Sequence, residues 1–391
     1  MQIDELKNLV RSGQFGGITL DTSIFERQAF KLESGLLKQL EQFRDSSTKL
    51  IISEVVKEEV LSHLTVKTKE AKKDIEKFLK QAKDYWQLED SEIERIKESV
   101  FDEREAQEVV FERFDQFTED TSLEIIEAKD YLVIDALIQK YFRAEPPFSE
   151  TGKKKNEFPD AIALISLERW AEQNETKMIV VSSDNDWKNF CKKSKYLVSV
   201  DDLAGALGFF QLENADDVCK YLSDKFNEGS LEELRVSVLN ALENEIYNFD
   251  IYLDANSDSG LVYEEEITSR QINGFEFNPL NSSNIIFRPV NFDGNSLVVE
   301  SRLKVNANIE CDFDFSKYDS IDGDYVEMGG NTIDVEAILE VEVLITFAGD
   351  LNKVGTEIEI DNVEIEIKKP FSIDVGDIDP DWEVDEYEDE D

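Results

Sequence analysis

The spacing of hydrophobic residues differs between two parts of this chain of 391 residues. Up to about residue 210, short apolar runs alternate with longer segments in which apolar residues recur every three or four positions. From about residue 246 the period falls to two, as in the runs DVEAILEVEVLITF and TEIEIDNVEIEIKK. The first pattern is typical of strands that alternate with amphipathic helices, and the second of strands with one wet face. The sequence therefore predicts an α/β domain followed by an antiparallel β domain.

Four apolar runs in the first part are predicted to be strands of one parallel sheet. Helical patterns separate them, as in FERQAFKLESGLLKQLEQFRD and DAIALISLERWAEQ. Short apolar strands that alternate with amphipathic helices are typical of α/β layered folds. The four runs are GGITL (16–20), LIIS within STKLIISEVV, MIVVSS within ETKMIVVSS (175–183) and SKYLVSV (194–200).

A long charged segment at about 65–143 follows the second of these strands. It has helical periodicity and is longer than a connection between two strands requires, so we interpret it as a helical insertion or lid. Its lysines have two interpretations that the sequence leaves open. They form either a solvated helix face or a surface that contacts substrate.

These patterns predict four parts along the chain. Turn residues such as DANSDSG and MGGN separate the alternating runs of the second half, which predicts antiparallel strands and, more specifically, a β-sandwich. The predicted parts are the α/β domain at 1–210, a helical connector at 211–245, the β domain at 246–380 and an acidic tail at 381–391.

The composition narrows the class of protein. Hydrophobic residues make up 41% of the chain, enough for a core in each of two domains. The three cysteines include no Cys-x-x-Cys pair, which argues against a zinc ribbon or disulfide framework and favours a reducing compartment. The N-terminus has no apolar signal core, and no run is long enough to span a bilayer. We therefore expect a cytoplasmic protein.

The formal net charge of −46 is extreme for a chain of this length. Taken alone it opposes a nucleic-acid partner, because the phosphate backbone favours basic surfaces. The segments TVKTKEAKKDIEKFLKQAK and GKKKNE are locally basic, however. The local field matters more than the total charge for a binding groove, so a nucleic-acid partner stays open.

Acidic residues follow two of the predicted strands directly. Asp21 comes after GGITL, and both Asp184 and Asp186 come after MIVVSS. Because the carboxyl ends of parallel strands share one edge of a sheet, we expect these side chains to meet there. Asp160 begins the helix DAIALISLERWAEQ, which is expected to pack beside the same edge.

Two further acids, Glu58 and Glu59, lie in the helix that follows LIIS. Together with the aspartates they would form a site with oxygen ligands only, which suits Mg²⁺ or Mn²⁺. Two such ions activate water and stabilise the leaving oxygen of a phosphodiester. The chain has one histidine, and it has no glycine-rich phosphate loop that would indicate a different chemistry.

Each acid also has an ordinary structural interpretation. Asp21 and Asp160 are suited to helix starts, Asp184 and Asp186 to a turn, and Glu58 and Glu59 to a solvated helix face. No acid taken alone distinguishes this structural interpretation from a role in a shared site. The order strand–Asp, strand–helix–Glu, Asp–helix, strand–Asp-x-Asp favours one shared site.

That order resembles the successive motifs of PIN-domain nucleases. The segments that carry the resemblance are ITLDTSIF, LIISEVVKEEVLSHL, PPFSETGKKKNEFPDAIALISL and IVVSSDNDW. The likeness is greatest to a bacterial subgroup with a PPF…K…FxDA segment, and it covers about residues 15–205 without the β domain. It implies a flavodoxin-like α/β/α sandwich and cleavage of RNA, or of structured DNA, with Mg²⁺ or Mn²⁺ held by acids.

Carried over position by position, the resemblance assigns roles to individual residues. It implies that Asp21, Asp160 and Asp184 bind metal, with Asp186 as an auxiliary acid. The Glu of the family's VxxE pattern falls on Glu59, three residues after Val56, although the adjacent Glu58 stays an alternative. Two hydroxyl residues match positions that flank the acids and are expected to hydrogen-bond them, namely Thr22 and Ser183.

The lysines before Asp160 acquire a second interpretation in this context. Lys153, Lys154 and Lys155 form either a solvated loop or a guide that holds the phosphates of the substrate. A cluster of acids without nearby cations would repel a polyanion.

The function expected from the sequence is therefore a metal-dependent endonuclease that acts on RNA. Three alternatives stay open: an inactive PIN-like platform that binds protein or nucleic acid, a structure-specific DNA nuclease, and a phosphatase on a related sheet. The last is disfavoured because LDTSIF lacks the second acid of a DxDx[TV] motif. The β domain is expected to recruit a protein partner or to self-associate.

Overall fold

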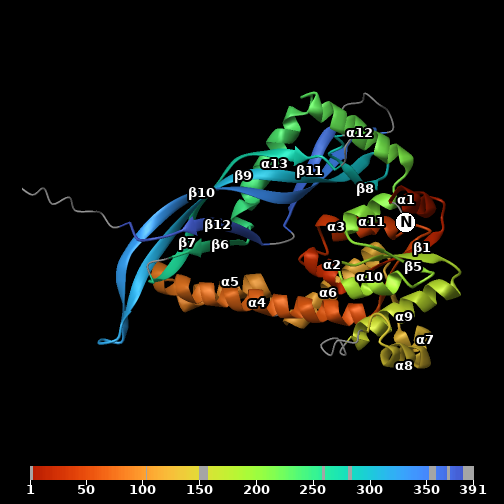
Figure 1. Cartoon of the computed structure of the whole chain (residues 1–391), viewed down its shortest axis with the longest axis horizontal. Coiled ribbons are helices and arrows are strands. Elements are labelled where there is room, and N and C mark those ends of the chain that lie inside the picture. Colours follow the sequence, from red (N-terminus) through yellow and green to blue (C-terminus); the bar gives the residue numbers. More distant parts are fainter. Residues whose placement is uncertain are drawn as a thin grey trace, which may run out of the picture. The chain divides into compact units, whose positions relative to one another are not determined.

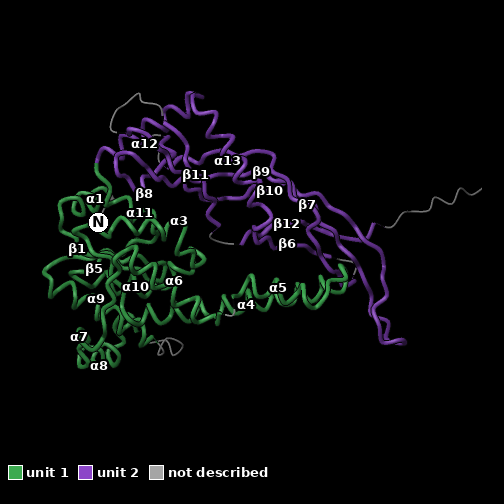
Figure 2. The backbone as a smooth tube through the Cα atoms, turned by 180° about the vertical axis from the view of Figure 1, so that it is seen from behind, with its two compact units in different colours: residues 1–212 green, residues 213–391 purple. Residues whose placement is uncertain are grey.

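The computed structural model describes residues 3–102, 104–148, 157–257, 260–280, 284–351, 358–367 and 370–381. The chain divides into two compact units, residues 1–212 and 213–391 (Figure 2). The predicted acidic tail lies outside the described residues apart from Asp381. In the part of the chain that the structure describes, no helix has the length and apolar character needed to cross a membrane.

Unit 1 is built on a parallel sheet with the strand order β3–β2–β1–β4–β5, of which β1 and β5 are labelled in Figure 1. The register places Ile18 of the central strand beside Leu50 on one side and Ile179 on the other. This confirms the predicted α/β fold. The strands are β1 (Phe15–Leu20), β2 (Lys49–Ser53), β3 (Glu124–Ile126), β4 (Lys177–Val181) and β5 (Leu197–Val200).

Both faces of this sheet are covered. Ile18, Thr19 and Leu20 are all fully buried, although successive side chains of a strand point to opposite faces. The sheet is therefore the middle layer of an α/β/α sandwich. The helices of unit 1 are α1 (Ile3–Arg11), α2 (Thr22–Arg27), α3 (Gly35–Lys38), α4 (Glu54–Trp86), α5 (Asp90–Phe101), α6 (Ala106–Thr121), α7 (Ala128–Tyr131), α8 (Ile134–Arg143), α9 (Phe158–Gln173), α10 (Asn185–Cys191) and α11 (Leu203–Phe209), with a 3₁₀ turn at Gln39–Phe43.

The charged segment at 65–143 is only in part an insertion. It contains β3, which pairs with β2 at the edge of the central sheet, and α6, whose Phe114 and Phe117 are buried. The strand escaped prediction because it has three residues. What projects from the body of unit 1 is the outer part of α4 together with α5, which we call the arm (Figure 2).

Unit 2 is organised around one long antiparallel sheet with the order β11–β10–β9–β7, and β8 also pairs with β9. Alternate residues of the central strand, such as Val305, Ile309 and Phe313, are fully buried on one face. This confirms the predicted antiparallel β domain. Its strands are β7 (Val262–Asn278), β8 (Arg288–Phe292), β9 (Ser296–Asp319), β10 (Asp324–Ala348) and β11 (Glu359–Glu366).

Helices rather than a second antiparallel sheet cover the apolar face. Leu222 of α12 (Glu213–Asn227) and Val238 of α13 (Glu232–Glu245) belong to the same core cluster as the buried residues of β9. Residues 211–245 were predicted to be a helical connector, but the helices at 213–245 contribute to the core of unit 2. A small parallel sheet of β6 (Ile251–Asn256) and β12 (Phe371–Asp377) packs on the same core through Ile373. The helices and this small sheet thus take the place of the second antiparallel sheet of the predicted sandwich. A 3₁₀ turn at Ile246–Asn248 precedes β6.

Candidate active site

Asp21 lies at the carboxyl end of β1 and is 6% exposed. It is the N-cap residue of α2, but its side chain makes no capping bond to that helix. Its carboxylate accepts hydrogen bonds from the Ser23 hydroxyl at 2.6 Å and the Ser182 hydroxyl at 2.8 Å. Burial raises the pKa of Asp21, and these hydroxyls partly offset the effect. The helix-start interpretation therefore does not describe what this side chain does.

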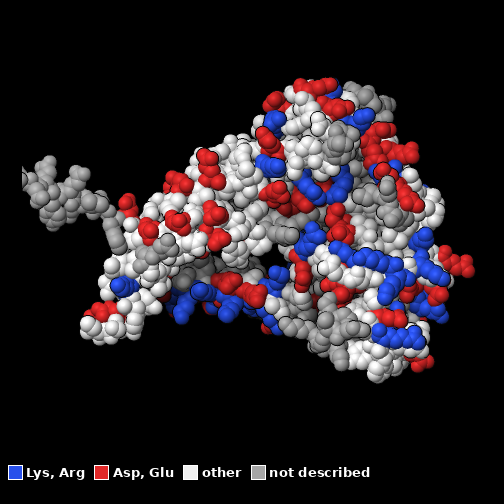
Figure 3. All heavy atoms as spheres, in the orientation of Figure 1, with Lys and Arg blue, Asp and Glu red and all other residues white. Residues whose placement is uncertain are grey.

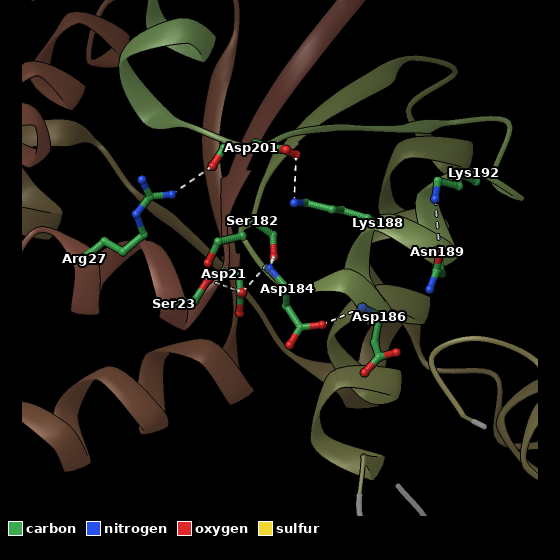
Figure 4. A network of polar contacts seen from close by, with 11 residues as sticks. Asp21, Ser23, Arg27, Ser182, Asp184, Asp186, Lys188, Asn189, Lys192 and Asp201 are labelled. Atoms are coloured by element: carbon green, nitrogen blue, oxygen red, sulfur yellow. Dashed lines mark hydrogen bonds and ion pairs between the residues drawn. The ribbon is translucent and has the colours of Figure 1, made fainter. Parts of the chain in front are cut away.

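Asp184 follows the neighbouring strand, β4, and begins α10, where its side chain accepts a bond from the backbone N–H of Asp186. The backbone N–H of Asp184 donates to the Ser182 hydroxyl at 3.0 Å, and that hydroxyl donates to Asp21. One serine thus fixes the positions of both acids. Figure 4 shows the Asp21 and Asp184 side chains next to each other at the strand ends, with Asp186 further along α10.

Asp160 lies in the first turn of α9, where the helix dipole favours a carboxylate. Its side chain accepts a hydrogen bond from the indole N–H of Trp187 at 2.9 Å. Trp187 is 1% exposed, and a buried indole N–H requires an acceptor. The helices α9 and α10 are thereby joined at the acid.

Glu59 and Glu58 differ clearly in their surroundings. Glu59 is half-buried, and its carboxylate accepts a hydrogen bond from the Thr22 hydroxyl at 2.6 Å. Glu58 is exposed and lies 3.4 Å from the Lys57 amine. Of the two alternatives that the sequence leaves open, only Glu59 faces the residues that follow β1.

The four acids are close enough for their charges to act on one another. Burial is the largest cause that raises the pKa of Asp160, to about 6, and the charges of Asp21, Glu59 and Asp184 raise it further. The Trp187 bond opposes this rise only in part. Four carboxylates from β1, α4, α9 and the end of β4 therefore form one electrostatically coupled cluster.

The hydroxyl groups that bond to the acids are only in part the predicted ones. Thr22 bonds to an acid as predicted from the resemblance, but Ser183 donates to the Ser23 hydroxyl at 3.1 Å rather than to a carboxylate. Ser182 and Ser23 hold Asp21 and were not predicted. The doublets TS and SS beside the acids indicated that hydroxyls would hold the carboxylates. They did not indicate which serine of each doublet points inward.

Two cations lie at the described edge of the site. The amine of Lys188 in α10 is 3.1 Å from the carboxylate of Asp201, and Arg27 of α2 donates to the backbone carbonyl of the same residue (Figure 4). The predicted phosphate guide, Lys153 to Lys155, lies outside the described residues.

The donor set fits a hard divalent cation in its chemistry. All the donors are carboxylate oxygens. Burial first, and then the charges of the other acids, raise the pKa of Asp160, and a bound cation would relieve both effects. Among the described residues, no three His, Cys, Asp or Glu side chains are grouped so as to hold a metal as they stand. Each carboxylate is held instead by a protein donor, namely Ser23 and Ser182, Thr22, Trp187 or the Asp186 amide.

Residues 18–187 match a family model described as a PIN domain. The match begins in β1, ends in α10 and includes all four acids of the cluster. Unit 1 therefore contains a PIN domain, a fold of nuclease type. Neither the curated proteins nor the solved structures gave a match to this chain.

In metal-free protein, Asp160→Asn is expected to raise the free energy of unfolding by about 1 kcal/mol at pH 7.5, because the variant lacks the buried charge and partial exposure limits the gain. The pKa of Asp160 is raised to about 6 in the folded protein, so the native state binds this proton more tightly than the unfolded chain. The contribution of Asp160 to the free energy of unfolding of the wild type therefore falls as the pH rises from about 4 to about 6.

Calorimetric melting in EDTA at pH 4.5 and 7.5 measures this effect. The Tm difference between Asp160→Asn and the wild type should be larger at pH 7.5. The matched control is Asp45→Asn, which removes an exposed carboxylate at the opposite edge of the sheet. Identical Tm values of the wild type and Asp160→Asn at pH 7.5 would show that the charge of Asp160 does not destabilise the folded protein.

Proposed function

We propose that unit 1 is a metal-dependent endonuclease that hydrolyses phosphodiester bonds of RNA. The observation that carries this proposal is the coupled cluster of Asp21, Glu59, Asp160 and Asp184 at the carboxyl edge of a PIN-domain sheet. Ligands bind at this edge in open parallel sheets. Mg²⁺ or Mn²⁺ is the proposed cofactor, held by Asp21, Asp160 and Asp184.

When bound, the cation supplies Lewis-acid activation of water and stabilises the leaving oxygen. The chain's own residues hold the acids in place for this chemistry. Ser182 and Ser23 fix the Asp21 carboxylate, and Trp187 fixes that of Asp160. Thr22 directs Glu59 into the site, where we assign it the role of orienting the attacking water. Water attacks phosphorus and the 3′-oxygen leaves, which yields a 5′-phosphate and a 3′-hydroxyl.

Substrate and cellular setting follow from the same proposal. Asp186 is proposed as an auxiliary acid. Lys188 and Arg27 at the described edge of the site (Figure 4), and separately Lys153 to Lys155, are proposed to hold substrate phosphates. All three cysteines are buried free thiols, which supports the cytoplasm as the place of action.

Incubation of the purified chain with RNA, single-stranded DNA and duplex DNA tests this function. Cleavage of RNA is expected with Mn²⁺ or Mg²⁺ and should stop in EDTA. The Asp160→Asn variant should be inactive under all conditions. RNA cleavage that persists in this variant at the wild-type rate would show that another site, or a contaminant, is responsible.

A further inference from the structure

The exposed face of α4 continues outward from the acid cluster. Glu59 is in the second turn of this 33-residue helix, and residues three or four positions apart lie on the same face. Counting outward from Glu59 at that spacing gives Ser62, Val66 and then four lysines. The α4 lysine row consists of Lys69, Lys73, Lys77 and Lys80, all of them exposed.

The row spans a distance that suits an extended chain. At 1.5 Å per residue, Glu59 and Lys80 are separated by about 30 Å along the helix axis, which is the length of several nucleotides. Seven lysines and three acids lie between Thr65 and Lys83, although the whole chain has a net charge of −46. Figure 3 shows basic side chains along the arm.

The lysines of α4 fall into two groups by their contacts. Lys83 forms an ion pair with Asp90, and Lys72 lies over the ring of Phe101, so these two hold α5 against α4. The four lysines of the row form no ion pair with any acid in the described parts of the chain. Lysines with a purely structural role would form ion pairs or ring contacts, and among the described residues these four exposed lysines form neither.

Two exposed aromatic rings lie in the outer half of the arm, roughly 90° around the helix axis from Lys77. Phe78 directly follows Lys77 and is 67% exposed, and Tyr85, seven residues later on the same side of the helix, is 86% exposed. Only Leu79 is buried in this half of the helix. Unpaired bases stack on exposed aromatic side chains while the backbone phosphates contact cations, so a single strand that passes around this side of the arm would meet both the lysines and the rings.

We propose that the α4 lysine row, together with Phe78 and Tyr85, binds a single-stranded polynucleotide and leads it to the acid cluster. This inference rests on the proposed nuclease function, because Glu59 joins the row to the site. The acids at the sheet edge repel a polyanion, and a row of cations on the helix that carries Glu59 offsets that repulsion. A duplex offers phosphates but no unpaired bases, so it engages the lysines alone.

Fluorescence anisotropy of the full chain, carrying Asp160→Asn and kept in EDTA, tests this proposal without cleavage. The probes are labelled single-stranded RNA, single-stranded DNA and duplex RNA of equal length. The combined variant Lys69→Gln, Lys73→Gln and Lys77→Gln is compared with Lys192→Gln, Lys193→Gln and Lys195→Gln. The second set removes the same charge from the opposite edge of the sheet, before β5.

The arm variant should bind single strands about tenfold more weakly, and its salt dependence should fall by about two in slope. The control set should bind within about twofold of the parent. Combined Phe78→Ala and Tyr85→Ala should weaken single-strand binding about tenfold and leave duplex binding unchanged. Comparison of the RNA and DNA strands shows whether the arm distinguishes the sugar.

Two results would overturn the proposal. One is a parent that binds no single strand, and the other is an arm variant whose affinity and salt slope equal those of the parent. Neither outcome depends on catalysis. A parent that binds strands through the arm but never cleaves them, even as the wild-type chain with Mn²⁺, would contradict the proposed function and leave the arm assignment standing.

Discussion

Replacement of Asp21 by asparagine is expected to lower RNA cleavage by more than about 100-fold, beyond the 10–100-fold typical for residues that only support a metal ligand. Asp21 is buried at the end of the central strand, and two hydroxyls donate to its carboxylate. Asparagine has nearly the same shape but no charge to offer a cation. The loss should appear in kcat with Mn²⁺, while the Tm in EDTA should not fall.

Ser182→Ala is expected to have a smaller effect than Asp21→Asn. It keeps the Asp21 carboxylate but removes the hydroxyl that bonds to Asp21 and to the Asp184 amide. About a tenfold loss of cleavage is expected, as for an outer-shell partner of a metal ligand. The surface control Asp45→Asn should cleave at the wild-type rate. Equal activity of Asp21→Asn and Asp45→Asn would remove Asp21 from the site.

The second large effect concerns adjacent residues of one helix. Glu59→Gln is expected to slow cleavage about 100-fold, within the range for loss of a positioned acid–base group. Glu58→Gln removes the same charge one residue away and should leave the rate within about twofold. The reason is geometric, because Thr22 holds Glu59 at 2.6 Å whereas Glu58 is exposed beside Lys57.

Single-turnover cleavage at saturating protein measures both variants without a contribution from weaker substrate binding. A result in which Glu58→Gln is the slower variant would mean that α4 is rotated in the active protein. Equal, small effects of the two substitutions would assign neither glutamate to the reaction.

The central sheet of unit 1 was predictable because its strands are uninterrupted apolar runs closed by polar residues. MIVVSS and GGITL show this most clearly, and they become β4 and β1. The strand β3 has only three residues within a charged segment, so no period identifies it. In unit 2 the alternation identified the strands, and residues 211–245 were predicted to be helical, but their packing over the sheet as α12 and α13 was not predicted. An amphipathic helix has the same pattern whether it links two domains or packs on a sheet.

The acids of the candidate site were predictable for a similar reason. Asp21 directly follows β1, and Asp184 follows β4 after two serines, so the topology of the parallel sheet alone brings them to one edge. Their supporting groups depend on packing, which the sequence does not display. The bond from Trp187 to Asp160 exists because α10 packs beside α9, and the choice of Ser182 over Ser183 depends on which hydroxyl faces the interior.

Calorimetric titration of the metal-free full chain with Mn²⁺ tests the central claim, that Asp21, Asp160 and Asp184 of the coupled cluster bind a divalent cation. The wild type and Asp45→Asn are expected to bind Mn²⁺ with the same affinity. Asp160→Asn should bind at least about tenfold more weakly, because it loses a proposed ligand. Mn²⁺ binding that is the same in the wild type and in Asp160→Asn would contradict the account.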